Sequence, residues 1–120
     1  SGLMGNASGV DDADLEKVLA NTLIEGEQVE KAYKVVRDMF IFTNKRLILL
    51  DKQGVTGSKM EMISIAYSKI TKFSKESAGH FDLDAELKIW VGSDPTPISK
   101  DFKAGDNIND VYRIISQYSL

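Results

Sequence analysis

The segment Phe40-Ile41-Phe42-Thr43-Asn44-Lys45-Arg46-Leu47-Ile48-Leu49-Leu50-Asp51 consists of two apolar runs joined by four polar residues. Each run is too short for an independent helix and is bounded by polar turn formers, so the pattern predicts a β-hairpin. Both runs are almost continuously apolar, whereas a strand with one face in water alternates. We therefore expect both faces of the hairpin to be covered, one by the core and the other by a helix or a second subunit.

The composition indicates one small acidic domain. Of the 120 residues none is cysteine, and the formal net charge is -3. This charge argues against broad attraction to nucleic acid, which is not an expected partner. Residues 1–10 are interpreted as a flexible tail without the features of a signal peptide, and residues 11–120 as a single domain. No apolar run approaches the roughly 20 residues that span a bilayer. The expected location is the cytoplasm, with the inner-membrane surface as an alternative.

The remaining patterns predict a series of strands followed by a helix. A short N-terminal helix begins at Asp11, keeps its apolar face to Leu23 and ends at Glu25-Gly26-Glu27. A final amphipathic helix is capped by Asp106 or Asn107. This order predicts a mostly β fold, a bent sandwich or partly open barrel closed by the last helix. The expected strands, about seven and antiparallel, start at Val29 and follow at 39–43, 47–51, 59–73 in two parts, 82–91 and 98–102, with a reversal at Arg37-Asp38.

The segment Phe42-Thr43-Asn44-Lys45-Arg46-Leu47-Ile48, the segment Ile65-Ala66-Tyr67-Ser68-Lys69-Ile70 and the terminal helix resemble the bacterial pleckstrin-homology-like (PH-like) domain family. The resemblance covers about residues 12–120. It implies a barrel of two near-orthogonal sheets capped by the C-terminal helix, without enzymatic activity or a cofactor. It also implies a cyclic homo-oligomer, for which we expect a pentamer, and a polar surface that binds another protein. A link to the cell-envelope stress response is a further implication.

The turn Thr43-Asn44-Lys45-Arg46 is the first candidate for a partner-binding site. It presents two cations and two hydrogen-bonding side chains at one tip. The alternative is an ordinary solvated turn, in which Arg46 covers a strand with its aliphatic stem. Lys69 and Lys72, in or beside the second matched segment, are expected to join this surface.

The oligomer interface is predicted at Trp90, Phe40 and Phe42. Trp90 falls in the outward phase of a strand whose other phase is apolar, and tryptophan is enriched at interface hot spots. The alternative for Trp90 is cover by the C-terminal helix. Phe40 and Phe42 belong to the hairpin that needs cover on both faces, which a neighbouring subunit or a helix can supply.

Catalytic and metal-binding groups do not converge in the sequence, and no metal site is expected. His80 is the only histidine, and without cysteine it cannot anchor an ordinary zinc site. Asp82, Asp84 and Glu86 alternate along a strand about 7 Å apart, too far to converge on one ion. We interpret them as a solvated face that resists aggregation. Gly54-Val55-Thr56-Gly57-Ser58-Lys59 lacks the glycine spacing of a phosphate-binding loop.

Peripheral binding to an anionic membrane is the alternative function. Each Lys or Arg near such a surface contributes only about 1 kcal/mol, so several must converge. The first hairpin offers only Lys31, Lys34 and Arg37, so the specific phosphoinositide site of eukaryotic pleckstrin domains is not expected. Membrane binding would instead use Lys45 and Arg46, multiplied by a ring of subunits.

Overall fold

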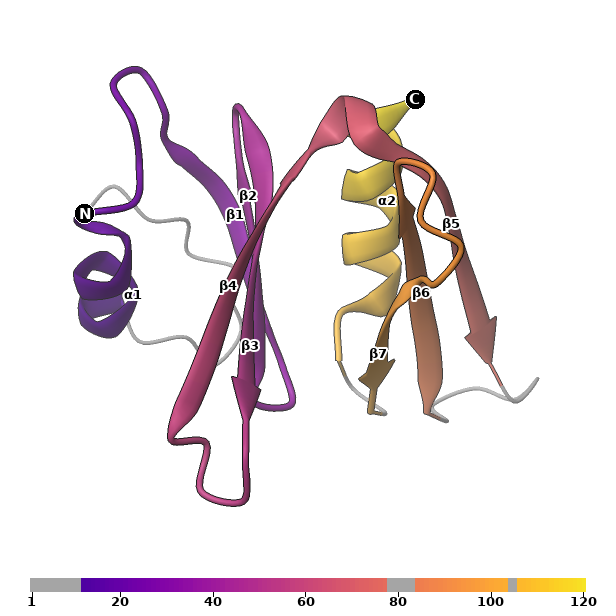
Figure 1. Cartoon of the computed structure of the whole chain (residues 1–120), viewed down its shortest axis with the longest axis horizontal. Coiled ribbons are helices and arrows are strands. Elements are labelled where there is room, and N and C mark those ends of the chain that lie inside the picture. The colour runs from indigo at the N-terminus through magenta and orange to yellow at the C-terminus, as the bar shows by residue number, and fades with distance from the viewer. Residues whose placement is uncertain (1–11, 78–83, 104–105) are drawn as a thin grey trace. The chain divides into compact units, whose positions relative to one another are not determined.

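The computed structural model describes residues 12–77, 84–103 and 106–120 (Figure 1). They form two compact units that divide between Ser64 and Ile65. The predicted tail, His80 and Asp82 lie outside the described residues. In chain order the elements are α1 (Asp12–Leu19), β1 (Val29–Val35), β2 (Asp38–Thr43), β3 (Arg46–Gln53), β4 (Lys59–Ala66), the 3-10 turn η1 (Tyr67–Lys69), β5 (Ile70–Ser77), β6 (Ala85–Val91), β7 (Ile98–Phe102) and α2 (Ile108–Ser119).

The first unit contains a four-stranded sheet in the order β1-β2-β3-β4. β1 and β2 are antiparallel, with Val35 opposite Asp38 and Val29 opposite Thr43. The reversal between them is therefore at Val36 and Arg37, one residue earlier than predicted. A bulge between Val29 and Lys31 shifts the register, so Val29 faces the same side of the sheet as Thr43.

Both faces of the hairpin formed by β2 and β3 are buried, as predicted. One face packs against α1 in a cluster that includes Leu15, Ile41 and Ile48. On the other face Phe40 and Phe42 have no exposed surface. Burial within one chain therefore explains the continuous apolar runs without a second subunit.

Helix α1 is shorter than predicted. It ends at Leu19, and the carbonyl of Leu19 accepts hydrogen bonds from the amides of Thr22 and Leu23 at 2.9 and 3.3 Å. The Thr22 hydroxyl donates to the carbonyl of Val18, a side-chain bond that competes with regular helix continuation. The apolar residue Leu23 still packs against the core from the connection to β1.

The second unit contains a three-stranded antiparallel sheet in the order β5-β6-β7, with α2 on one face (Figure 1). Val111 and Ile115 of α2 are buried, which confirms the predicted apolar stripe. The ring of Tyr112 meets that of Phe73 edge to face, with 5.1 Å between the ring centroids. The ring of Tyr118 stacks on that of Tyr67, with 4.6 Å between the centroids. Asn107 occupies the N-cap position, but its side chain makes no capping hydrogen bond.

The predicted fold class is confirmed. The described residues form two antiparallel sheets of four and three strands, preceded by a short helix and followed by a longer one. None of the helices in the described part of the chain is long and apolar enough to cross a bilayer.

Candidate functional site

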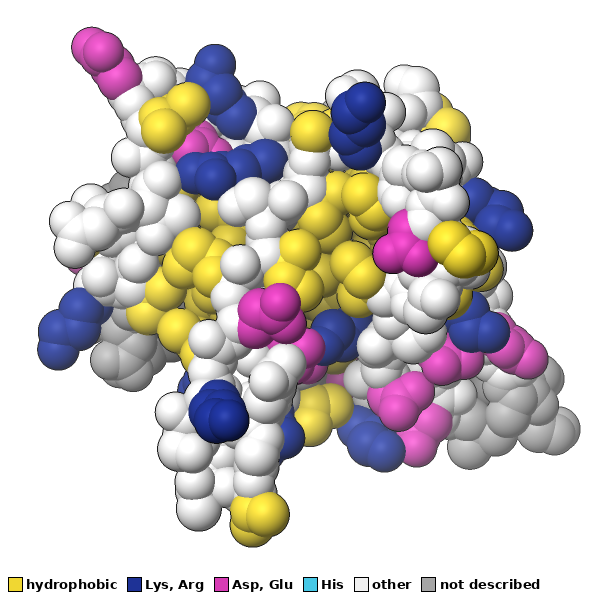
Figure 2. Space-filling view, in the orientation of Figure 1, with side chains coloured by type: hydrophobic (Ala, Val, Ile, Leu, Met, Phe, Trp, Pro, Cys, Tyr) yellow, Lys and Arg dark blue, Asp and Glu magenta, His cyan; other side chains and the backbone are white. Residues whose placement is uncertain are grey.

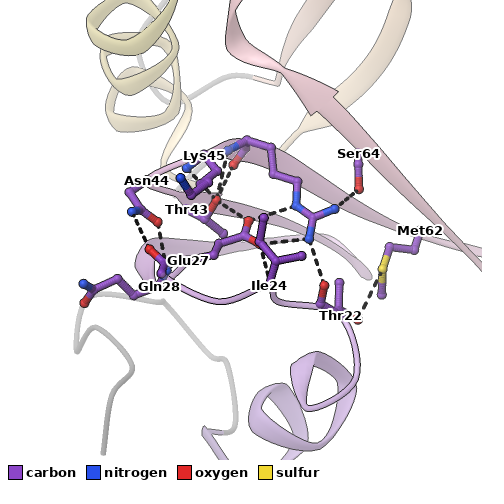
Figure 3. Close-up of polar contacts among 11 residues, drawn as sticks. Thr22, Ile24, Glu27, Gln28, Thr43, Asn44, Lys45, Met62 and Ser64 are labelled. Atoms are coloured by element: carbon purple, nitrogen blue, oxygen red, sulfur yellow. Dashed lines mark hydrogen bonds and ion pairs between the residues drawn. The ribbon is translucent and has the colours of Figure 1, made fainter.

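The turn between β2 and β3 is anchored by the carboxylate of Glu27, a residue that the sequence analysis did not select (Figure 3). Its side chain has no exposed surface. Oε2 accepts hydrogen bonds from Thr43 Oγ1 at 2.7 Å and from Arg46 Nε at 2.9 Å. Oε1 accepts from Arg46 Nη2 at 2.9 Å and from the amide of Ile24 at 3.1 Å. We call Glu27, Thr43 and Arg46 the Glu27 clasp.

The guanidinium of Arg46 is hydrogen-bonded to other groups of the same chain. Besides its two-pronged contact with Glu27, it donates from Nη2 to the carbonyl of Thr22 and from Nη1 to Ser64 Oγ, both at 2.9 Å. The side chain keeps 23% of its surface exposed. A planar group with several fixed donors suits such a bidentate contact with a carboxylate. Arg46 therefore joins the α1–β1 connection to β3 and β4.

The pKa of Glu27 reflects this pairing. The hydrogen bond from Arg46 is the main cause that lowers it from 4.5 to about 2, while burial acts in the opposite direction. Bonds from Thr43 and the Ile24 amide and the charge of Arg46 lower it further. Glu27 raises the pKa of Arg46 in return. Glu27 is therefore ionised at neutral pH and is not suited to general acid chemistry there.

Thr43 and Asn44 order the backbone of the turn. Thr43 Oγ1 accepts hydrogen bonds from the amides of Lys45 and Arg46 at 3.0 and 2.9 Å. Asn44 Oδ1 accepts from the amide of Gln28 at 2.8 Å, and Nδ2 donates to the carbonyl of Gly26 at 2.9 Å. The Asn44 side chain thus continues the pairing of β1 with β2 beyond Val29.

The structure assigns internal roles to three of the four residues predicted to bind a partner at this turn. Thr43 is buried, and the side chains of Asn44 and Arg46 are hydrogen-bonded within the chain. Lys45 is exposed, and its side chain forms no ion pair with the residues that the structure describes. The turn is therefore neither a loose solvated loop nor a cluster of free binding groups.

The register of β1 and β2 explains why the sequence analysis missed Glu27. A regular ladder from the Val36-Arg37 reversal would place Val29 opposite Asn44. The bulge shifts Val29 opposite Thr43 and so places Glu27 beside the Thr43 hydroxyl. The sequence gives only a weak signal for Glu27, because Glu25 and Glu30 are also carboxylates at the start of the first strand.

The predicted contact residues Lys69, Lys72 and Trp90 belong to the second unit. Lys69 ends η1, and its carbonyl accepts a hydrogen bond from the amide of Gly92. Lys72 places its ammonium 4.2 Å from the ring centre of Trp90, which is half-buried. Phe73 contacts α2, and the side chains of successive strand residues point to opposite faces of a sheet, so Lys72 is on the other face. Trp90 is directly opposite Lys72 and therefore also lies on the face away from α2. The alternative that α2 covers Trp90 is therefore wrong.

The surface of the described residues is hollowed in at least two places. One, about 320 Å³, lies between α1 and the start of β1 and is lined by Leu19, Leu23, Glu27 and Val29 among others. The other, about 430 Å³, lies at the end of the sheet in the second unit and is mostly acidic. No group of three His, Cys, Asp or Glu side chains suited to a metal ion occurs in the described ranges.

Residues 1–119 match the bacterial PH domain family. The chain belongs to this family. Among its relatives, this PH domain is 52% identical over 116 residues to the uncharacterized protein YjqA of Bacillus subtilis, covering 96% of the chain and 93% of YjqA. It is 30% identical over 102 residues to the uncharacterized protein YozO of the same organism, covering 85% of the chain and 87% of YozO.

Solved bacterial PH domains have the same fold. A pleckstrin homology domain from Shewanella amazonensis is 48% identical, with a TM-score of 0.85 and coverage of 98% of this PH domain and 94% of the other chain. A DUF1696 family protein with a pleckstrin-homology domain from Shewanella loihica is 46% identical, with a TM-score of 0.75 and coverage of 92% and 95%.

Proposed function

We propose that this bacterial PH domain is a non-enzymatic interaction module that assembles into a closed ring and presents the β2–β3 turn to a protein partner. The observation that carries the proposal is the Glu27 clasp. It holds the turn through a buried ion pair and a network of hydrogen bonds while Lys45 stays exposed. Because a rigid surface loses little conformational entropy on binding, such a turn is preorganised for recognition.

Open sheet edges support self-association. The two sheets have β1 and β4, and β5 and β7, as their outer strands. β4 exposes the apolar side chains of Met60 and Met62 by 45% and 38%. Natural proteins cover or pair such edges, and contacts between unlike surfaces produce rings when the rotation closes. Trp90 is the proposed aromatic contact, and five subunits remain the expected number.

Phe40 and Phe42 are not included in the proposed interface. Neither side chain has exposed surface in the single chain. A charge inserted at Phe40 would therefore disrupt the core, so loss of assembly in such a variant would report on folding.

The non-enzymatic character is supported by the state of the site. The carboxylate of Glu27 is ionised and hydrogen-bonded on both oxygens, so it has no free position for proton transfer. The proposed role is therefore structural support of a binding surface. A place in the cell-envelope stress response remains part of the proposal through the family resemblance alone.

Gel filtration with light scattering, followed by a binding assay, tests this function. We expect a mass several times the 13.3 kDa of one chain. We further expect immobilised wild type and Lys17→Glu to retain a common protein from a bacterial lysate that Lys45→Glu does not retain. Lys17 is an exposed residue of α1 and controls for the change of charge. A monomer, or equal retention by all three proteins, would contradict the proposal.

A second assay, pelleting with lipid vesicles, tests the alternative function of membrane binding. The structure removes Arg46 from the pair of cations on which that alternative depended, because Glu27 engages its guanidinium. We therefore expect no salt-sensitive pelleting with vesicles of phosphatidylglycerol. Pelleting that is lost in Lys45→Glu would favour the membrane alternative instead.

A further inference from the structure

Two exposed valines lie at the end of the first sheet opposite the Glu27 clasp. Val36, in the reversal between β1 and β2, is 53% exposed, and Val55, in the loop between β3 and β4, is 102% exposed. Arg37 Nη1 donates a 2.7 Å hydrogen bond to the carbonyl of Gly54, which ties the two loops together. The valines therefore belong to one composite surface.

Val36 adopts a conformation that is unfavourable for its side chain. Its φ is +59°, in the left-handed region, which β-branched residues rarely occupy. Backbone strain of this kind is frequent at functional sites. An exposed valine at a position suited to glycine or asparagine suggests that its side chain is used in a contact.

Exposed cations outnumber exposed carboxylates on the surface around the valines. Lys34, Arg37, Lys52 and Lys59 are exposed there, whereas Asp38 and Asp51 are half-buried and Glu61 is exposed. Asp38 Oδ1 also accepts a hydrogen bond from the amide of Lys52. Figure 2 shows the β3–β4 hairpin projecting, with Lys or Arg side chains along it and an apolar side chain at its end. We call Lys34, Val36, Arg37, Lys52, Val55 and Lys59 the basic tip.

The second unit carries a surface of opposite charge. Glu86 in β6 is directly opposite Glu76 in β5 and Asp101 in β7, so three carboxylates form a row across the sheet. Like charges in opposed positions destabilise a sheet. Lys88 lies 3.7 Å from Glu86 and offsets part of this repulsion.

This row borders the 430 Å³ hollow, which we call the acidic hollow. Lys103, 3.3 Å from Asp84, contributes one cation to its lining. Figure 2 shows the acidic side chains gathered at this end of the sheet. The rest of the lining consists of Ser77, Asp84, Ala85 and Lys103.

We propose that the basic tip of one subunit docks in the acidic hollow of the next. This inference rests on the proposed ring and names its two contact surfaces. The convex tip and the concave hollow are opposite in charge, and the contact would relieve the repulsion among Glu76, Glu86 and Asp101. Because the two surfaces differ, the contact is head to tail, the kind that closes into a ring. Trp90 and Glu86 lie on the same face of β6, so Trp90 extends the contact face.

The chemistry of the contact predicts its sensitivity to salt. The apolar surface of two valines is too small to hold a subunit by itself. The ionic part is exposed at the rim and is screened when the Debye length falls to about 3 Å at 1 M salt. Each subunit makes two such contacts in a ring, which raises the stability of the closed assembly.

Charge reversal tests the docking through two double variants of the full chain. Lys52→Glu with Lys59→Glu reverses two of the four cations of the tip, and Glu76→Lys with Asp101→Lys reverses two of the four carboxylates of the hollow. Light scattering should show the wild type as an oligomer and each double variant at the 13.3 kDa of a monomer. An equal mixture of the two variants should regain a multimeric mass, and so should the chain that carries all four substitutions. The control, Lys17→Glu with Arg113→Glu, makes the same change of net charge as the tip reversal, but on α1 and α2, and should keep the wild-type mass.

The outcomes separate this inference from the proposed function. If the wild type is an oligomer and either double variant keeps its mass, the docking is wrong while the ring stands. A wild-type monomer would overturn both. Pelleting with phosphatidylglycerol vesicles that the tip reversal abolishes, with no change of mass, would assign the tip to a membrane and overturn the docking.

Discussion

Glu27 is the residue on which the order of the β2–β3 turn depends. Its buried carboxylate receives hydrogen bonds from Arg46, Thr43 and the amide of Ile24. An ion pair removed from water stabilises a fold only when its remaining hydrogen-bonding capacity is satisfied. In the clasp both carboxylate oxygens and all three guanidinium nitrogens have partners. Removal of one member is therefore expected to cost more than loss of a surface ion pair.

Glu27→Gln should lower the free energy of unfolding by about 3 kcal/mol, because it leaves Arg46 partly buried without its counter-charge. Urea unfolding at pH 7 measures the change. Glu25→Gln, at an exposed neighbour, is the matched control and should change stability by less than about 0.5 kcal/mol. Equal midpoints for the two variants would show that the clasp contributes little.

Because the pKa of Glu27 is lowered on folding, the stability of the chain should depend on pH. The pKa of Glu27 is lowered to about 2 in the folded chain from 4.5. Its contribution, about 3 kcal/mol from the difference in pKa, is complete above about pH 5 and is lost as the pH falls towards 2. The difference in urea midpoint between wild type and Glu27→Gln should therefore shrink from pH 5 to pH 2.5. A constant difference would contradict the assignment.

At Val36 a substitution is expected to raise the stability of the chain. Val36→Gly relieves the positive φ, so the free energy of unfolding should rise by about 1 kcal/mol, measured where light scattering shows both proteins as monomers. The same variant should weaken self-association, because it removes an apolar side chain of the basic tip. A less stable monomer would show that the conformation of Val36 is not strained.

At the scale of elements, the β2–β3 turn depends on one hydroxyl. Thr43→Val keeps the shape of the side chain but leaves the amides of Lys45 and Arg46 without their acceptor. We expect a loss of about 2 kcal/mol and faster hydrogen exchange at these two amides. Thr43→Ser keeps the hydroxyl and should preserve slow exchange there. Equal exchange in the Val and Ser variants would contradict this role.

Elements with strong periodicity could be predicted from the sequence. In the apolar runs that begin at Phe40 and in the apolar stripe of α2, the spacing of apolar residues follows from which side chains are buried. The predicted strands and helix are therefore confirmed. The end of α1 depends instead on a side-chain bond of Thr22, and the position of Glu27 on a bulge. Neither leaves a periodic pattern. The turn at Thr43 was recognised as special, but its inward-facing hydrogen bonds depend on contacts distant in the sequence.

At the scale of the whole molecule, the proposed function requires association between copies of the chain. Open sheet edges, the half-buried Trp90 and the paired basic and acidic surfaces are all features of one subunit that a neighbour would complete. The Glu27 clasp is independent of this association, since its contacts are within one chain. Variants of the clasp should therefore affect folding, and variants of the basic tip should affect assembly.

The absolute mass of the wild-type chain, measured by light scattering during gel filtration at micromolar concentration, tests whether the chain forms a ring. We expect one species several times heavier than 13.3 kDa, with five subunits as the expected number. We also expect this mass to fall in 1 M salt, where the contacts of the basic tip are screened. A single species of 13.3 kDa at low salt would contradict the ring and the docking together.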